Sequence, residues 1–267
     1  MRKFFVRLAG GLVILALVLA SVLAVKAPEW LDAAKNAVIQ AAEAKIDGKV
    51  VIDKIEVTWY HGIHFKQVRL LDKQNSLVAE APDVSVELNY YRLLTGREPM
   101  AAVRAVHVEQ PGFTLVEKEG RWNTQGLIKP QEAAEPVFYG RVYVHKGQGR
   151  IVTESADQTF TLEGSVDAGA WPQYDVAAEL GLAGDVIAVK GKIDRSGNGE
   201  LSAQTARLDV ARVIKLVQEK LPIKLTQGTI HDATVRLVRR AGQEDWQGQA
   251  RVAGLEAVYG EQTVQAE

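Results

Sequence analysis

The sequence predicts a mainly-β protein, in which an N-terminal transmembrane helix is followed by a long antiparallel sheet with a few short helices. Apolar and polar residues alternate with a period of two through most of the chain after Gly48, which is typical of half-buried strands. Turn-forming residues separate these stretches, as hairpins require. An uncharged run near the N-terminus has the length that a membrane-spanning helix needs.

Composition excludes several classes of function. The 267 residues carry a formal net charge of -1, and nucleic-acid-binding domains usually have a basic excess, so no nucleic-acid partner is expected. The chain contains no cysteine, which excludes disulfide scaffolds, thiolate metal sites and cysteine nucleophiles. The hydrophobic and charged fractions, 47% and 24%, are those of an ordinary globular protein rather than a disordered one.

Residues 1–27 are expected to be a cytoplasmic N-terminus and a transmembrane anchor. Arg2, Lys3 and Arg7 precede the uncharged run 8–25, and Lys26 closes it. Because positive charges favour the cytoplasmic flank, this arrangement places the N-terminus in the cytoplasm and the rest of the chain across the membrane. A cleaved signal peptide is the alternative, but the run exceeds the roughly 7 to 15 residues of a signal-peptide core.

Residues 28–47 predict a juxtamembrane amphipathic helix. Pro28 suits the first helical turn, apolar residues recur at helical spacing from Leu31 to Ala42, and Gly48 follows the end. Trp30 lies just outside the apolar run, where interfacial aromatic residues are common, so the helix could rest on the membrane surface. It could equally cap the first strands, and the sequence leaves both arrangements open.

From residue 48 onward, the alternation predicts strands joined by hairpins. Turn signals occur at 72–75, 119–120 and 196–199, and the segment Gly147-Gln148-Gly149 is also interpreted as a hairpin turn. The expected strands are 54–59, 62–71, 77–88, 102–108, 113–118, 138–145, 151–153, 159–166, 175–182, 186–193, 199–204, 223–238 and 246–252.

The predicted strands fall into two portions with two short helices among them. Helices are expected at 90–95 and at 209–221, where Asp209 can cap the start and Pro222 stops the end. The polar, proline-flanked segment 129–136 is predicted to be a linker between an N-terminal β module, 48–128, and further β repeats, 137–267. The final stretch has no closing cap, so the repeats are expected to be incomplete at the C-terminus.

Two short helices cannot cover the apolar side of a dozen strands. The sheet must fold on itself as a sandwich or barrel, or leave an apolar groove that another molecule fills. From the residues alone, a sandwich is favoured.

No constellation of residues predicts catalysis, and the protein is not expected to be an enzyme. His61 and His64 have no third ligand nearby to complete a metal site. His107, His145 and His231 stand alone on predicted strands, without a serine or carboxylate placed to form a triad. No metal or cofactor is therefore expected.

Several short motifs follow the anchor in a fixed order over residues 1–128. This ordered series resembles the AsmA-like family, and within it the TamB-type translocation and assembly module proteins of diderm bacteria. Beyond residue 128, the strands resemble the family only in style. The motifs are Gly48-Lys49-Val50-Val51-Ile52, Gly62-Ile63-His64-Phe65, Tyr91-Arg92-Leu93-Leu94-Thr95-Gly96, Gln110-Pro111-Gly112-Phe113 and Gly120-Arg121-Trp122-Asn123.

The resemblance implies a long, taco-like β-groove lined by apolar residues, which projects from the inner membrane into the periplasm. Phospholipid acyl chains would occupy this groove, so the implied function is phospholipid transfer toward the outer membrane in outer-membrane biogenesis. The alternative is a scaffold or assembly factor for outer-membrane protein insertion or protein secretion, with an outer-membrane β-barrel assembly protein as its partner. Family members that cross the envelope are much longer than this chain.

Candidate lipid-contacting residues lie on the more apolar faces of the clearest strands. The same side chains could equally form a protein core, and a buried charge would distinguish the two roles because a core excludes water. The candidates are Ile55, Val57, Trp59, Val84, Val86, Leu88, Val176, Ala178, Leu180 and Leu182.

Overall fold

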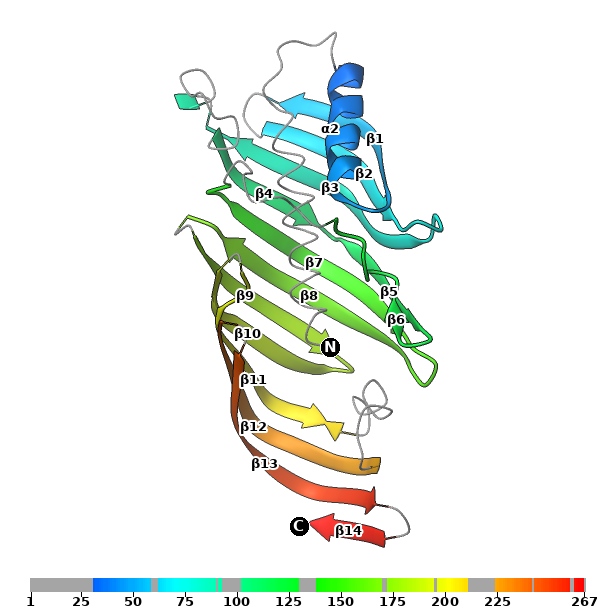
Figure 1. The fold of residues 1–267 in the computed structure, drawn as a ribbon, viewed down its shortest axis with the longest axis vertical. Coiled ribbons are helices and arrows are strands. Elements are labelled where there is room, and N and C mark those ends of the chain that lie inside the picture. Colours follow the sequence, from blue (N-terminus) through cyan, green and yellow to red (C-terminus); the bar gives the residue numbers. More distant parts are fainter. Residues whose placement is uncertain are drawn as a thin grey trace.

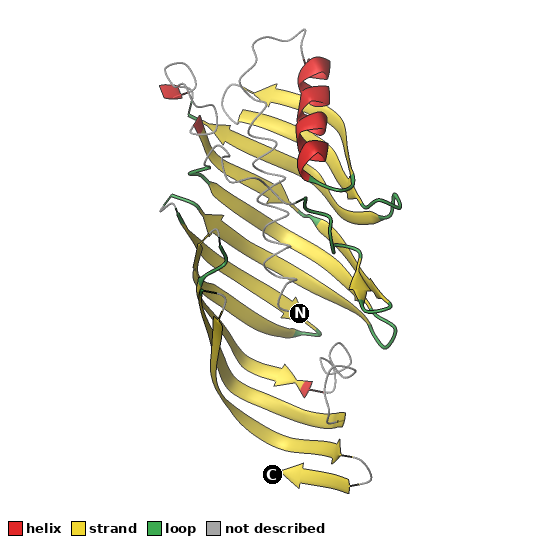
Figure 2. Ribbon diagram, viewed as in Figure 1, coloured by secondary structure: helices red, strands yellow, loops and turns green. Residues whose placement is uncertain are grey.

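The structure is a computed structural model that describes residues 31–58, 62–89, 91–92, 102–129, 138–169, 172–194, 196–210, 224–241, 243–259 and 262–266. Strands dominate these residues, which confirms the prediction of a mainly-β protein (Figure 2). The elements are α2 (Leu31–Lys45), β1 (Lys49–Thr58), β2 (Gly62–Leu71), β3 (Leu77–Leu88), β4 (Val103–Glu109), β5 (Gly112–Lys118), β6 (Arg121–Trp122), β7 (Arg141–Val152), β8 (Asp157–Asp167), β9 (Gln173–Leu182), β10 (Asp185–Asp194), β11 (Gly199–Asp209), β12 (Lys224–Arg240), β13 (Gln243–Tyr259) and β14 (Gln262–Ala266).

The strands join in one 14-stranded sheet. Its order is β1-β2-β3-β4-β7-β8-β9-β10-β11-β12-β13-β14, with β5 and β6 off this path. The strands stack along the long axis of the molecule, from β1 beside the helix to β14 at the opposite end (Figure 1). The sandwich favoured from the residues alone is therefore wrong for the described strands, because they form one sheet rather than two.

Helix α2 lies against the first strands of the sheet (Figure 1). Its buried residues Val38 and Ala42 belong to the same hydrophobic cluster as Phe65 of β2 and Val84 of β3. Hydrogen bonds fix the end of the helix, since the Lys129 N–H donates to the Lys45 carbonyl at 3.0 Å. Of the two arrangements that the sequence leaves open for this helix, the structure shows its apolar side capping the sheet.

Several hairpins lie where the turn residues predict them. The predicted bounds of the second and third strands, 62–71 and 77–88, are those of β2 and β3. Asp72 makes the turn between them, because its Oδ1 accepts the N–H groups of Gln74 and Ser76, each at 2.8 Å. The turns at 119–120 and 196–199 likewise join antiparallel pairs, β5 with β6 and β10 with β11.

The interpretation of Gly147-Gln148-Gly149 as a hairpin turn is wrong, because these residues lie inside the continuous strand β7. The glycines serve packing instead. A Cβ atom added at Gly149 would lie 2.2 Å from the ring of Phe160 on the neighbouring strand β8. The aromatic ring thus fills the place of the missing side chain, which a pattern of turn-forming residues does not reveal.

Strand β7 also shows that the sheet is not purely antiparallel. Strands β4 and β5 follow one another beside β7, separated by Gln110 and Pro111, and both pair with it in parallel. Their other partner, β3, is antiparallel to both. Because β7 follows the predicted linker 129–136, the two predicted portions of the chain share a single sheet.

Some predictions fall outside the described residues. These are the transmembrane anchor 8–25, the residue Trp59, most of the segment 90–95, most of the linker 129–136 and the helix 209–221 beyond Val210. Within the described ranges, no helix has both the length and the apolar character required to cross a membrane.

Candidate functional site

One face of the sheet carries two rows of apolar residues and glycines that run across the strands. Directly paired residues of neighbouring strands lie on the same face, and residues two apart in a strand share that face. The first row crosses β1 to β4 and β7 to β13 without a polar side chain. Its members are Val57, Ile63, Val86, Val106, Val142, Val166, Val176, Gly191, Leu201, Leu237 and Trp246.

The second row crosses the same strands, two residues away in each. It contains smaller side chains in its C-terminal half. Its members are Ile55, Phe65, Val84, Val108, Val144, Gly164, Ala178, Val189, Ala203, Val235 and Gly248. The two rows together are called the apolar face below.

Protein covers the apolar face at β3, β4 and β7, and side chains at the β13 end are exposed. The first-row residues Val86 and Val142 are 0% and 2% exposed and belong to the hydrophobic cluster that includes Val38 and Ala42 of α2. From β8 to β11 every member of the two rows is half-buried. At the far end, Val235 and Trp246 are 39% and 54% exposed.

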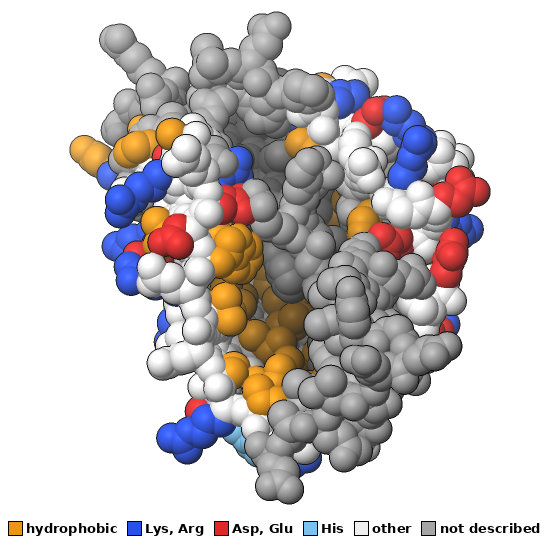
Figure 3. Space-filling model, turned by 60° about the horizontal axis from the view of Figure 1, so that its bottom comes forward, with side chains coloured by type: hydrophobic (Ala, Val, Ile, Leu, Met, Phe, Trp, Pro, Cys, Tyr) orange, Lys and Arg blue, Asp and Glu red, His pale blue; other side chains and the backbone are white. Residues whose placement is uncertain are grey.

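The open part of the molecule is hollow. Viewed with the β14 end brought forward, hydrophobic side chains gather inside a hollow, and charged side chains lie on the outer surface around it (Figure 3). Soluble proteins rarely expose a large continuous apolar surface, and such surfaces usually bind a partner or a ligand. This part of the apolar face is therefore the candidate functional site.

The ten residues predicted to contact lipid divide according to burial. Val84, Val86 and Leu182 are buried in the hydrophobic clusters of the protein. Val57 is 58% exposed in β1, and Trp59 lies outside the described residues. The half-buried candidates are Ile55, Leu88, Val176, Ala178 and Leu180.

The residues predicted to contact lipid omit several members of the open part, including Val189, Leu201 and Leu237. Each lies in a stretch whose alternation is visible in the sequence. The register between strands, however, depends on irregular pairings such as the one between His231 and Thr234 in β12. Because a shift of one residue would move a side chain to the other face, continuity across strands requires the structure.

The opposite face of the sheet is polar and carries ion pairs between strands. Arg141 of β7 pairs with Asp167 of β8 at 2.6 Å, and Arg236 of β12 pairs with Glu200 of β11 at 2.7 Å. The hydrogen bond from Arg236 holds the pKa of the Glu200 carboxyl below its ordinary value. The two faces therefore differ in chemistry, because the two apolar rows contain no charged side chain whereas the opposite face carries ion pairs between strands.

Histidines on the polar face interact with carboxylates and do not form a cluster of metal ligands among the described residues. The His64 Nδ1 lies 3.0 Å from a carboxylate oxygen of Asp83, and the His107 Nε2 lies 3.1 Å from Glu87. His107 Nδ1 is also 3.2 Å from the Nε2 of His145. Among the residues that the structure describes, no three histidine or acidic side chains gather as a metal site would require.

Gly191 lets two strands approach closely in the middle of the apolar face. A Cβ atom added there would lie 2.0 Å from the carbonyl oxygen of Glu200 on β11. Gly191→Ala is therefore expected to lower the free energy of unfolding by about 1–3 kcal/mol, because the strands must move apart. Urea denaturation followed by tryptophan fluorescence measures the change.

Gly248→Ala is the matched control for Gly191→Ala. Gly248 lies in the second row, and its nearest neighbour to an added Cβ, the Thr234 carbonyl oxygen, is 3.4 Å away. We expect this variant to shift the free energy of unfolding by no more than about 0.5 kcal/mol. Equal stabilities of the two variants would contradict the close approach at Gly191.

Comparison with models of known protein families finds no match to this chain, and no curated protein matches it.

Proposed function

We propose that the protein is an inner-membrane-anchored, periplasmic protein whose open apolar face carries phospholipid acyl chains toward the outer membrane. The observation that supports this proposal is the continuity of the two apolar rows, which are half-buried from β8 to β11 and exposed at β12 and β13. The anchor and the location rest on the uncharged run 8–25 and the basic residues before it.

The chemistry of the face suits acyl chains. Each buried methylene stabilises the bound chain by about 0.8 kcal/mol of transfer free energy from water. An acyl chain is therefore held by the amount of apolar surface that it buries rather than by specific contacts. The rows offer no charged side chain from Val57 to Trp246 at which a chain would be trapped or repelled. Movement along such a surface needs no covalent step, and headgroups can remain in water at the margin of the sheet.

Photocrosslinking in the full-length chain tests this proposal. A photoreactive benzophenone amino acid at Val189, which faces the open hollow side of β10, is expected to crosslink to phospholipid in cells of a diderm bacterium. Radiolabelled phosphate and mass spectrometry of the purified adduct identify the lipid. The reactive group would lie among half-buried apolar neighbours such as Ala178 and Ala203.

Ala188 provides the matched control, because it precedes Val189 in the same strand and lies on the polar face between Glu179 and Gln204. The probe at Ala188 should give no lipid adduct. Equal lipid labelling at both positions, or none at Val189, would contradict the proposal. Adducts at Val189 with an outer-membrane barrel-assembly protein instead of lipid would favour the role of scaffold or assembly factor.

A further inference from the structure

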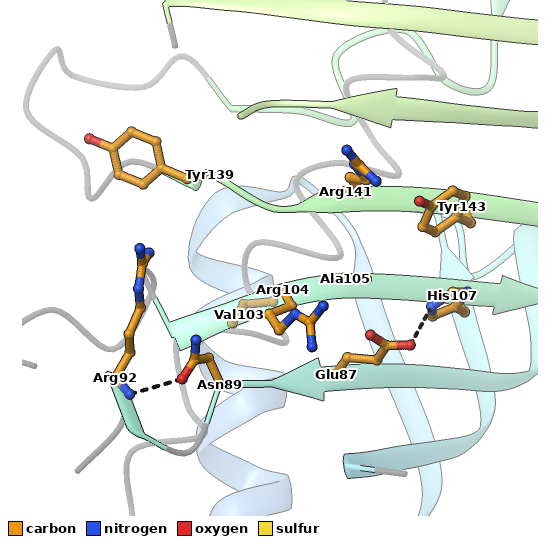
Figure 4. Close-up of a pocket in the computed structure, with 10 residues that line it drawn as sticks. All are labelled: Glu87, Asn89, Arg92, Val103, Arg104, Ala105, His107, Tyr139, Arg141 and Tyr143. Carbon is orange, nitrogen blue, oxygen red and sulfur yellow. Dashed lines mark hydrogen bonds and ion pairs between the residues drawn. The ribbon is translucent and has the colours of Figure 1, made fainter. Parts of the chain in front are cut away.

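A second candidate site lies on the polar face, away from the apolar rows. A pocket of about 510 Å³ opens where β3 ends and where β4 and β7 begin (Figure 4). Glu87, His107 and Tyr143 line it, and each alternates along its strand with a buried valine of the first row. The pocket therefore occupies the side of the sheet opposite the proposed acyl surface, at one margin of the strands.

Three arginines, Arg92, Arg104 and Arg141, line this pocket. Arg141 donates through Nε to Asp167 at 2.6 Å. Among the described lining residues, the one carboxylate is that of Glu87, which lies 3.1 Å from a ring nitrogen of His107. Arg141 and Glu87 thus each have a partner on the same face of the sheet.

Arg104 is the arginine best placed to hold a ligand. It is exposed at the start of β4, and among the residues that the structure describes its side chain has no hydrogen-bond or ion-pair partner. Its guanidinium group lies in the centre of the labelled side chains, between the strands that carry Glu87 and Arg141 (Figure 4). Most other arginines of this face are paired across strands, such as Arg141, Arg150 and Arg236.

An aromatic wall adds hydrogen-bonding groups next to these charges. The rings of His107 and Tyr143 stack with centroids 4.9 Å apart and an interplanar angle of 15°. This stack holds the phenolic hydroxyl of Tyr143 on the wall of the pocket that Arg141 also lines. The wall gives the pocket fixed polar groups on β-strands, whereas isolated surface arginines are held only by their own flexible side chains.

We propose that this pocket binds a phosphodiester group. A phosphodiester carries one negative charge, which matches the one positive charge of the Arg104 guanidinium, and its two non-bridging oxygens accept the paired N–H groups of a guanidinium. Such a group can belong to a phospholipid headgroup or to a soluble molecule. The proposal is independent of the acyl surface, since the pocket lies on the other face of the sheet.

Calorimetric titration of the full-length protein in a phosphate-free maltoside detergent tests the pocket. One arm uses glycerophosphoglycerol, a soluble phosphodiester, and the other uses phosphatidylglycerol in mixed micelles of the same detergent. Saturable binding in the first arm assigns the site to a free phosphodiester. Saturable binding in the second arm alone assigns it to a lipid headgroup. In both cases Arg104→Gln is expected to weaken binding about tenfold, because a charge-assisted hydrogen bond is lost.

Arg121→Gln is the matched control, because Arg121 is an exposed arginine on β6 outside the pocket. It should bind both probes as tightly as the unaltered protein. Arg92→Gln supplies a second variant within the pocket, and circular dichroism confirms that each variant is folded. The proposal is overturned if neither probe saturates, or if Arg104→Gln and Arg92→Gln both bind as tightly as the unaltered protein. Lipid crosslinking at Val189 would be unaffected by that outcome, so the two proposals fail separately.

Discussion

Leu201→Asp is expected to reduce phospholipid crosslinking at Val189 by about tenfold or more without unfolding the protein. The introduced carboxylate stays hydrated, so the protein remains folded, but it makes the surface unfavourable for an acyl chain. Leu201 is half-buried in the first row, between Gly191 of β10 and Leu237 of β12. A charge at this open position remains close to water, whereas a charge in a closed core does not.

Ser202→Asp is the control for this variant, because Ser202 is the next residue of β11 and pairs with Lys190 and Arg236 on the polar face. It adds the same charge to the same strand and should leave the adduct at Val189 unchanged. Adduct yield is measured per folded molecule, with the melting temperature of each variant recorded. Global unfolding of Leu201→Asp would show that protein, rather than lipid, closes this part of the face.

Phe65→Ala is expected to lower the free energy of unfolding by about 3–5 kcal/mol, the usual cost of removing a buried aromatic side chain. Phe65 is fully buried and pairs with Ile55 and Val84 in the second row. Val38 and Ala42 of α2 belong to the same cluster, so no other group can fill the space without a shift of the helix. Urea denaturation of the purified protein measures the loss.

Val235→Ala is the comparison for Phe65→Ala, because Val235 lies in the same row at the open end and is 39% exposed. We expect its effect on the free energy of unfolding to stay below about 1 kcal/mol. A similar loss in both variants would show that the two ends of the apolar face are equally closed. A loss below about 1 kcal/mol at Phe65 would contradict the packing of α2 on the sheet.

The sequence predicts the strands well because alternation is a local property. The bounds of β2 and β3 follow from the apolar positions and from the turn at Asp72. The parallel pairing of β7 with β4 and β5 does not follow, because the chain between them is long and the partner strand is chosen by packing. The same limit explains Gly149, whose role depends on Phe160 in another strand.

Only the apolar character of the candidate site could be predicted from the sequence. Alternation correctly indicates that residues such as Val176 and Ala178 share one face. It cannot tell that Val86 is buried in a hydrophobic cluster while Val176 stays half-buried, since that difference depends on which distant elements, α2 among them, pack into the cluster. The arginine pocket was missed for a related reason, because Arg104 and Arg141 are brought together by the parallel strand pair.

The number of strands that the open part of the apolar face crosses limits the number of lipids that the protein could hold. Neighbouring strands lie about 4.8 Å apart, so the five steps from Val166 of β8 to Trp246 of β13 extend about 24 Å along the sheet. The acyl chains of one bilayer leaflet span about 15 Å, which is half of the hydrocarbon core of about 30 Å. The open part of the face is longer than one acyl chain. Lipids on this face would therefore form a queue in which each lipid advances only when the one ahead departs.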